Sequence, residues 1–330
     1  MPDLKQIKYQ KVIIHDNVEA IYRYFLYLIN TTTDLYEKEK LKKEIKNGLK
    51  DSLSRYYVFQ HNGITFISSG MGSAQTNILV ELLKKNDCKA IIKIGTCSAL
   101  DDNLQEGAII VPYGAIIDEG ATHWRSIKRI HDKKEFFVLK TSNSYKNLRN
   151  KLKNITKEYF KKKSFVKCNT RLRQKLIEAL KESKYEFINN TKFPNICVWS
   201  VDSYDCFDSS PKFYSQLNKE VYEINKFLSK TNPTEKVRII GVEMECSSLF
   251  SSSNSLNIPA AAYIIVSRNR NRLLFDNREF FKVKDMCLNK VDNLEQINEP
   301  EQRKIELIHE SEKKCFRFSV EILKKVKIIN

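Results

Sequence analysis

Strand-like apolar segments alternate with amphipathic helical segments along most of the chain, and this alternation restricts the possible folds more than any other feature. Predicted strands cover residues 11–15, 56–60, 64–68, 90–100, 195–200 and 237–240, with a further apolar run at 260–266, and predicted helices cover residues 18–29, 34–50, 74–85 and 299–326. Alternating β and α elements bury their apolar faces by placing helices against a sheet. We therefore expect an α/β fold, in one large domain or two small ones, because 330 residues allow either.

Two predicted strand ends carry residues suited to binding. The strand at 64–68 runs into Ser69 and then Gly70-Met71-Gly72, where glycines allow positive φ and the amides of the next helix favour an anion or a polar oxygen. The strand at 90–100 holds Lys93 within an apolar run and Thr96 near its carboxyl end, where ligands bind in α/β sheets. Lys93 can pair with an anion and Thr96 can donate its hydroxyl. The structural alternatives are a plain tight turn and a lysine that reaches the surface.

A pair of carboxylates marks another junction of this kind. The segment Gly241-Val242-Glu243-Met244-Glu245-Cys246 follows the strand at 237–240 and is predicted to open a helix. Burying two carboxylates there is costly unless something donates hydrogen bonds to them, and a ligand with hydroxyl groups would do so. Glu243 and Glu245 project in different directions, so we expect them to have separate roles. The alternative is a helix N-terminus that simply favours negative charge.

The net charge of +17 is concentrated in one segment. Residues 125–163 carry 14 lysines and arginines against three acidic residues. A solvated, Lys/Asn-rich insertion accounts for this composition. The alternative is an electrostatic surface for RNA, DNA or an acidic partner, but no Gly/aromatic motif typical of RNA-binding modules accompanies the charges. We therefore do not expect nucleic acid as a partner.

Hydropathy and cysteine spacing favour a cytoplasmic protein. No apolar run reaches the roughly 18 residues of a membrane span, and the first residues lack the apolar segment of a signal peptide. The eight cysteines are scattered, and none forms a Cys-x-x-Cys motif. We expect reduced thiols in the core, with no disulfide framework, no metal site and no contact with membranes.

Together these segments resemble the nucleoside phosphorylase family, specifically the hexameric type that includes uridine phosphorylases and bacterial-type purine nucleoside phosphorylases. The most similar part runs from Gly70 to Leu100, where Gly-Met-Gly, a helix and Ile-Gly-Thr-Cys-Ser-Ala-Leu follow at family spacing. Val-Glu-Met-Glu at 242–245 and Val266-Ser267-Arg268 look most similar to the uridine phosphorylase branch. The resemblance implies a three-layer α/β/α sandwich with a central mixed sheet, as a single domain over residues 1–330 with a basic insertion at about 126–163.

The resemblance also implies how the nucleoside would bind. Glu245 would hold the 2′ and 3′ hydroxyls of the ribose, with Met244 packed against the sugar and Glu243 beside it. Gly70 would lie under the base, and Tyr204 matches an aromatic residue of the base pocket.

The implied reaction is phosphorolysis, in which phosphate is the nucleophile and a pentosyl group is transferred from the base. Lys93 and Thr96 would contact phosphate, Thr96 would also touch the ribose, and Arg55 would come from a neighbouring subunit. Arg268 would act with Glu245 in catalysis by stabilising the departing base. The family needs no metal or organic cofactor, serves nucleoside salvage, and pairs its subunits, so the resemblance implies a dimer-based homo-oligomer, up to a hexamer.

The chain departs from the family at the phosphate and the base. His15-Asp16-Asn17-Val18 stands where the family has Gly-Asp-Pro followed two residues later by arginine. Asp208 and Ser210 stand near the positions of the Gln and Arg that read uracil, and Arg268 replaces the aspartate of the purine enzymes. Purine or pyrimidine specificity therefore stays open. Three functions remain: a nucleoside phosphorylase, a hydrolytic nucleosidase, and a catalytically weak paralogue that binds a nucleoside or a macromolecular partner.

Overall fold

The computed structural model describes residues 9–50, 56–101, 103–118, 164–183, 195–201, 221–222, 225–226, 237–269 and 299–326. The elements follow in the order β1 (Lys11–His15), α1 (Val18–Thr31), α2 (Leu35–Lys50), β2 (Tyr57–His61), β3 (Ile64–Ser68), α3 (Ser73–Lys85), β4 (Ala90–Ala99), β5 (Ile109–Ile110), β6 (Gly114–Asp118), β7 (Ser164–Lys167), α6 (Thr170–Glu182), β8 (Asn195–Val201), β9 (Val237–Glu243), α8 (Cys246–Ser255), β10 (Ala260–Asn269) and α11 (Glu299–Lys325). The predicted basic insertion at 126–163 lies outside the described residues.

The ten strands of the described residues form one mixed sheet. Its order is β2-β3-β1-β4-β9-β8-β6-β7, with β10 paired to β4 and β5 paired to β10. Strands β3, β1, β4 and β10 are parallel, so their carboxyl ends meet at one edge of the sheet. Strand β9 pairs with β4 in the antiparallel sense, through Val242 opposite Ser98 and Gly241 opposite Ala99. The end of β9 therefore reaches this edge as well.

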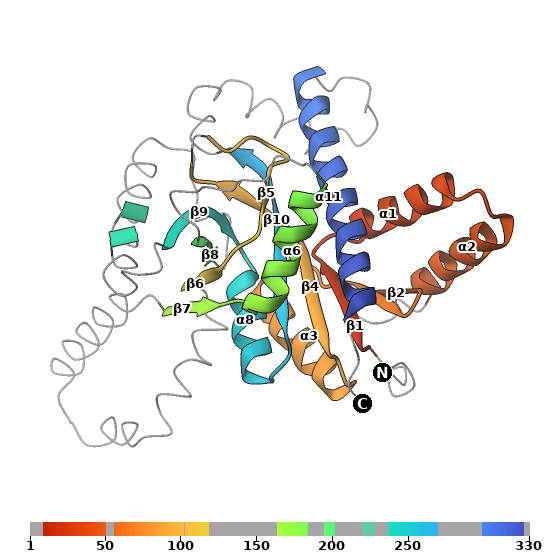
Figure 1. Ribbon diagram of the computed structural model, residues 1–330, viewed down its shortest axis with the longest axis horizontal. Coiled ribbons are helices and arrows are strands. Elements are labelled where there is room, and N and C mark those ends of the chain that lie inside the picture. The colour runs from red at the N-terminus through yellow and green to blue at the C-terminus, as the bar shows by residue number, and fades with distance from the viewer. Residues whose placement is uncertain are drawn as a thin grey trace, which may run out of the picture.

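Helices cover both faces of the sheet. Alternate residues of β4 point to opposite faces: Ile92 and Ile94 pack in a core with α1, α2, α6 and α11, and Ile91 packs in a second core with α3 and α8. Figure 1 shows α6 and α11 crossing in front of β4 and β10, and α1 and α2 extending together beside β2. Helices α3 and α8 are in contact, and Ser252 of α8 donates a buried hydrogen bond to Asn77 of α3. The predicted three-layer α/β/α sandwich with a mixed sheet is confirmed.

One predicted boundary was wrong, and it concerns the carboxylate segment. The helix predicted to open at Gly241 begins at Cys246, and β9 continues through Glu243. Strands β4 and β8 flank this part of β9, with Glu243 opposite Ser200, and their ladders satisfy backbone groups that a helix would otherwise bond internally. Glu243 therefore lies on a strand, while Glu245 is the N-cap residue of α8.

Two local sequence signals, a helix cap and a tight turn, explain where α1 begins and how β2 turns into β3. Asn17 caps α1, because its side chain accepts a hydrogen bond of 2.8 Å from the Glu19 amide. Asn62 and Gly63 have φ values of 49° and 72° and close the predicted β2–β3 hairpin, a conformation typical of a two-residue Asn-Gly turn.

Candidate active site

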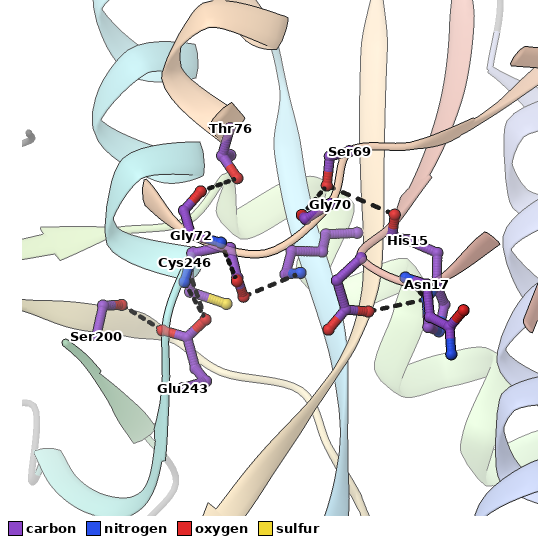
Figure 2. A network of polar contacts seen from close by, with 12 residues as sticks. His15, Asn17, Ser69, Gly70, Gly72, Thr76, Ser200, Glu243 and Cys246 are labelled. Carbon is purple, nitrogen blue, oxygen red and sulfur yellow. Dashed lines mark hydrogen bonds and ion pairs between the residues drawn. The ribbon is translucent and has the colours of Figure 1, made fainter. Parts of the chain in front are cut away.

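A cavity of about 530 Å³ lies at the carboxyl ends of β1, β3 and β4. Its lining comes from the end of β1 and the start of α1, from the start of β2, from the end of β3 and the loop after it, and from β4 and α11: His15, Asp16, Asn17, Val18, Tyr57, Ser68, Gly70, Met71, Thr96 and Glu312. Figure 2 shows His15 and Asn17 on one side of the loop that carries Ser69, Gly70 and Gly72, with Glu243 and Cys246 on the other side. The site therefore has a β1 half and a β9 half.

The loop between β3 and α3 joins the two halves. Gly70 and Gly72 have φ values of 67° and 104°, a region that favours glycine. The Ser69 amide donates to the His15 carbonyl at 2.9 Å, and the Thr76 hydroxyl donates to the Gly72 carbonyl at 3.2 Å. These bonds fix the loop so that the Gly72 amide points at the β9 half, where it donates to Glu245 Oε1 at 2.7 Å.

Glu243 is fully buried and bonded within the chain. Its Oε2 accepts from the amides of Glu245 and Cys246 at 2.8 and 2.7 Å, and its Oε1 accepts from the Ser200 hydroxyl. Ser200 Oγ in turn accepts from the Ser247 amide at 2.9 Å. Glu243 therefore satisfies the first amides of α8 and holds the backbone of Glu245 in place. The contacts of Glu243 are those of a positioning residue.

Glu245 and Lys93 form a buried ion pair, with Lys93 Nζ 3.3 Å from Glu245 Oε2. Lys93 is 1% exposed. The position of its side chain depends on Gly95, two residues further along β4. A Cβ at Gly95 would lie 2.8 Å from Lys93 Nζ and 3.0 Å from its Cε. The side chain of Lys93 therefore runs along β4 over Gly95, toward the carboxyl edge where Thr96 lines the cavity. The Ile-Gly-Thr motif leaves room for the lysine.

The β1 half contains a chain of charged groups. His15 Nδ1 lies 2.8 Å from Asp16 Oδ1, His15 Nε2 lies 3.6 Å from Glu312 Oε1, and Arg23 Nη2 lies 2.7 Å from Glu312 Oε2. The Asn17 amide donates to His15 Nδ1 at 2.9 Å, a bond that Nδ1 can accept only while it carries no proton. A protonated Nδ1 instead faces the Asp16 carboxylate. The ring of His15 stacks on Phe316 of α11. These contacts fix His15 between two carboxylates.

The environment shifts the pKa of several of these groups. Burial would lower the pKa of His15, but Asp16 and Glu312 outweigh it and raise the pKa to about 9, so His15 is a cation at neutral pH. Burial raises the pKa of Glu245 to about 7, although Lys93 opposes the rise. Burial would also lower the pKa of Lys93, but Glu245 and Asp16 raise it above its ordinary value. Lys93 is therefore charged.

Comparison with known proteins identifies the family of this fold. A family model described as the phosphorylase superfamily matches residues 31–298, which is more than half of the chain. The chain belongs to the phosphorylase superfamily. This superfamily includes nucleoside phosphorylases and nucleosidases, so the chain is a divergent member of a superfamily of enzymes.

Solved structures of the phosphorylase superfamily share the fold. Uridine phosphorylase from Vibrio fischeri is 17% identical with a TM-score of 0.56, covering 98% of this chain and 93% of that chain. AMP nucleosidase from Bacteroides thetaiotaomicron is 14% identical with a TM-score of 0.53, covering 96% of this chain and 90% of that chain. No curated protein sequence matches the chain. At these identities the likeness shows the fold only. The reaction has to be argued from the residues of the site.

The structure brings most of the predicted site residues to one sheet edge. Gly70 and Thr96 line the cavity, Lys93 and Glu245 pair beside it, and half-buried Met244 lies between the two glutamates. Arg268 is exposed near the end of β10, opposite Ser98 of β4. Tyr204 and Arg55 lie outside the described residues. The roles of all these residues in binding stay predictions.

Sequence reasoning missed several groups of this site. It noted His15 and Asp16 only as a departure from a familiar loop, and it assigned no role to Ser200 or Glu312. Glu312 had a signal, because a charged residue at a core-facing position of the long helix needs a buried partner. Ser200 had none, because only the pairing of β8 with β9 places it beside Glu243.

The described residues contain no group of three or more His, Cys, Asp or Glu side chains arranged to hold a metal ion. The six cysteines within the described ranges are free and buried, as predicted for core thiols: Cys88, Cys97, Cys168, Cys197, Cys246 and Cys315. No helix in the described part of this phosphorylase-superfamily chain is long and apolar enough to cross a membrane.

Proposed function

We propose that this protein cleaves the N-glycosidic bond of a nucleoside and that Glu245 holds the ribose hydroxyls. The observation that carries this proposal is the buried carboxylate of Glu245, oriented by the Gly72 amide and Lys93 beside a cavity lined by Gly70 and Thr96. A carboxylate oxygen has two lone pairs, so each Glu245 oxygen can accept a further hydrogen bond from a hydroxyl. The adjacent 2′ and 3′ hydroxyls of a ribose would supply two such donors.

The chemistry of N-glycosidic bond cleavage agrees with the groups found at this site. Cleavage proceeds through a sugar with oxocarbenium character, and a carboxylate near the ring stabilises the developing positive charge. In the proposed mechanism Glu245 orients the ribose through its hydroxyls, and Arg268 stabilises the electron pair that leaves with the base. Glu243 keeps Glu245 in place through the Glu245 amide.

The acceptor of the ribosyl group defines the reaction. With phosphate as acceptor the protein is a nucleoside phosphorylase, a pentosyltransferase of the uridine phosphorylase type that needs no cofactor. Lys93 and Thr96 support this form, because β4 supplies both a buried cation, Lys93, and a hydroxyl, Thr96, that lines the cavity. Arg55 of a neighbouring subunit would complete the phosphate contacts.

One observation favours water as the acceptor, which makes the protein a hydrolytic nucleosidase. Three cations of the described site lie beside a carboxylate: Lys93 beside Glu245, His15 beside Asp16, and Arg23 beside Glu312. Phosphate would have to compete with these carboxylates for positive charge, whereas a neutral acceptor would not.

Release of free base tests the proposal. The protein is incubated with a panel of purine and pyrimidine nucleosides, with and without inorganic phosphate, and base and sugar products are separated by chromatography. Free base with ribose 1-phosphate supports the phosphorylase, and free base with ribose in phosphate-free buffer supports the nucleosidase. No base from any nucleoside under either condition contradicts the proposal and favours a catalytically weak paralogue.

The matched variant is Glu245→Gln, because an alanine would leave Lys93 without its 3.3 Å partner and confound binding with folding. The glutamine keeps the shape and one acceptor oxygen. We expect base release to fall roughly 10- to 100-fold, as for the loss of a charged hydrogen bond of about 1.5–3 kcal/mol. Glu39→Gln on the exposed face of α2 makes the same change of net charge and should not alter the rate.

We further propose a cytoplasmic homo-oligomer built from dimers and acting in nucleoside salvage. This proposal is supported by membership of the phosphorylase superfamily and by the prediction that Arg55 contacts phosphate in a neighbouring subunit. Light scattering on the purified chain tests the assembly, and a monomer at micromolar concentration would contradict it.

A further inference from the structure

Strand β10 changes its register against β4 shortly before it ends. Val266 of β10 pairs with Cys97 of β4, and the next pair is Arg268 with Ser98. Ser267 is therefore an extra residue on β10, and its hydroxyl donates to the Cys97 carbonyl at 3.0 Å. One extra residue on one strand is a β-bulge, and bulges beside active sites serve to re-aim a side chain.

The residue before the bulge is held on both edges of β10. On one edge the Val266 amide donates to the Ala108 carbonyl at 2.9 Å, and the Gly107 amide donates to the Val266 carbonyl at 2.8 Å. On the other edge Val266 keeps the regular register against β4 that begins at Ala260. The change of register is thus confined to Ser267, whose hydroxyl bonds the bulge to β4.

The bulge decides on which face of the sheet Arg268 lies. Successive residues of a strand point to opposite faces, so a slip of one residue exchanges the faces. Val266 packs in the core with α3 and α8, and in a regular strand Arg268, two residues later, would point to that face as well. Because Arg268 pairs with Ser98, it lies instead on the opposite face, which Ile92 and Ile94 of β4 share with α11.

The cavity lies at this same face. Thr96 lines the cavity and precedes Ser98 by two residues, so both side chains point to one side of β4. Glu312 reaches the cavity from α11, the helix that crosses this face in Figure 1. Arg268 is therefore on the cavity side of the sheet, one strand away from Thr96 and two residues further toward the carboxyl end of β4.

We propose that Ser267 is a positioning residue for departure of the base, because the bulge that its hydroxyl bonds to β4 turns Arg268 onto the cavity face of the sheet. This proposal rests on the nucleoside cleavage proposed above, in which the C1′–N bond breaks with its electron pair on the base. A guanidinium on the cavity face stabilises that developing charge. Ser267 acts only through Arg268 and needs no contact with the substrate.

The direct test is a double-mutant cycle on base release in phosphate buffer, where either acceptor is present. Ser267→Ala removes the hydroxyl and should lower kcat roughly 3- to 10-fold with little change of KM, as for one hydrogen bond whose effect is felt in the transition state. Arg268→Met should lower kcat at least as far. Adding Ser267→Ala to Arg268→Met should then have no further effect, because the two residues act as a unit. Ser267→Thr keeps the hydroxyl and should release base at the wild-type rate.

Ser183→Ala is the matched control. The Ser183 hydroxyl also donates to a backbone carbonyl, that of Leu180 at 2.7 Å, but it does so at the C-terminus of α6. This variant should keep the wild-type kcat. If Ser267→Ala does not fold, Ser267→Val takes its place, compared with the isosteric Ser267→Thr. An equal loss of kcat in Ser183→Ala, or a further loss when Ser267→Ala is added to Arg268→Met, would overturn the proposal.

The leaving group separates positioning of Arg268 from a general disturbance of the strand. A p-nitrophenyl riboside releases a stable phenolate that needs little help from a cation, so Ser267→Ala should cleave it at the wild-type rate while remaining slow on nucleosides. An equal loss on both substrates shows a merely structural role and overturns the proposal.

The same assay distinguishes failure of this proposal from failure of the proposed function. Wild-type protein that releases no base from any nucleoside refutes nucleoside cleavage itself. Wild-type protein that releases base at a rate that Ser267→Ala does not change refutes only the role of Ser267.

Discussion

His15 gives the fold a stability that depends on pH, and its size follows from the structure. The pKa of His15 rises from 6.5 to about 9 on folding, because Asp16 and Glu312 outweigh the effect of burial. Each pKa unit corresponds to about 1.4 kcal/mol, so protonated His15 stabilises the folded state by about 3 kcal/mol. A raised histidine pKa gives stability that is fully present below pH 6.5 and is lost as the pH rises through 9.

The perturbation is His15→Gln, and the assay is urea unfolding at pH 6 and at pH 9.5. We expect the loss of stability caused by the substitution to be about 3 kcal/mol larger at pH 6 than at pH 9.5, because the variant lacks the His15 proton that stabilises the folded wild type at pH 6. The lost packing on Phe316 lowers the stability of the variant equally at both pH values. Other groups titrate in both proteins and cancel in the difference. Equal destabilisation at the two pH values would refute the assignment of His15 as a buried cation.

Three further substitutions address the β9 half of the site. Lys93→Met should lower the free energy of unfolding by about 3–5 kcal/mol, because it leaves Glu245 buried without its cation, and adding Glu245→Gln should recover part of the loss in urea unfolding. Gly95→Ala places a Cβ 2.8 Å from Lys93 Nζ and should lower kcat/KM for nucleoside cleavage while circular dichroism stays unchanged; unchanged kinetics would contradict the path of the lysine. Ser200→Ala removes a buried partner of Glu243 and should cost about 1–3 kcal/mol of stability, which thermal unfolding measures; a smaller loss would mean that water or another group replaces the hydroxyl.

The sequence predicted the layers and most elements because hydrophobic periodicity determines which face of each element is buried. Strand 11–15 and strand 64–68 were predicted with the bounds that the structure has, and the Asn62-Gly63 turn identified the hairpin partner of strand 64–68. The start of α8 was mispredicted because strand pairing extends β9 to Glu243, and pairing between distant strands leaves no local signal.

The residues of the candidate site also fall into those with a local sequence signal and those placed only by the tertiary fold. Lys93, Thr96 and Glu245 could be found from sequence, because the first two stand out as polar residues within the recognisable apolar strand β4 and Glu245 directly precedes α8. The compensation of Lys93 by Asp16 could not, since it depends on the register of β1 beside β4. Glu312 reaches the cavity from a helix that begins 30 residues after β10 ends, so only the tertiary fold brings it to His15.

The most direct test of the account is a crystal structure of the protein soaked with a nucleoside. The account predicts density for a ribose with its 2′ and 3′ hydroxyls within hydrogen-bonding distance of Glu245, beside the Gly70 turn and Thr96. A ribose bound elsewhere, or a Glu245 carboxylate that contacts only Gly72 and Lys93 while the nucleoside is bound, would contradict it.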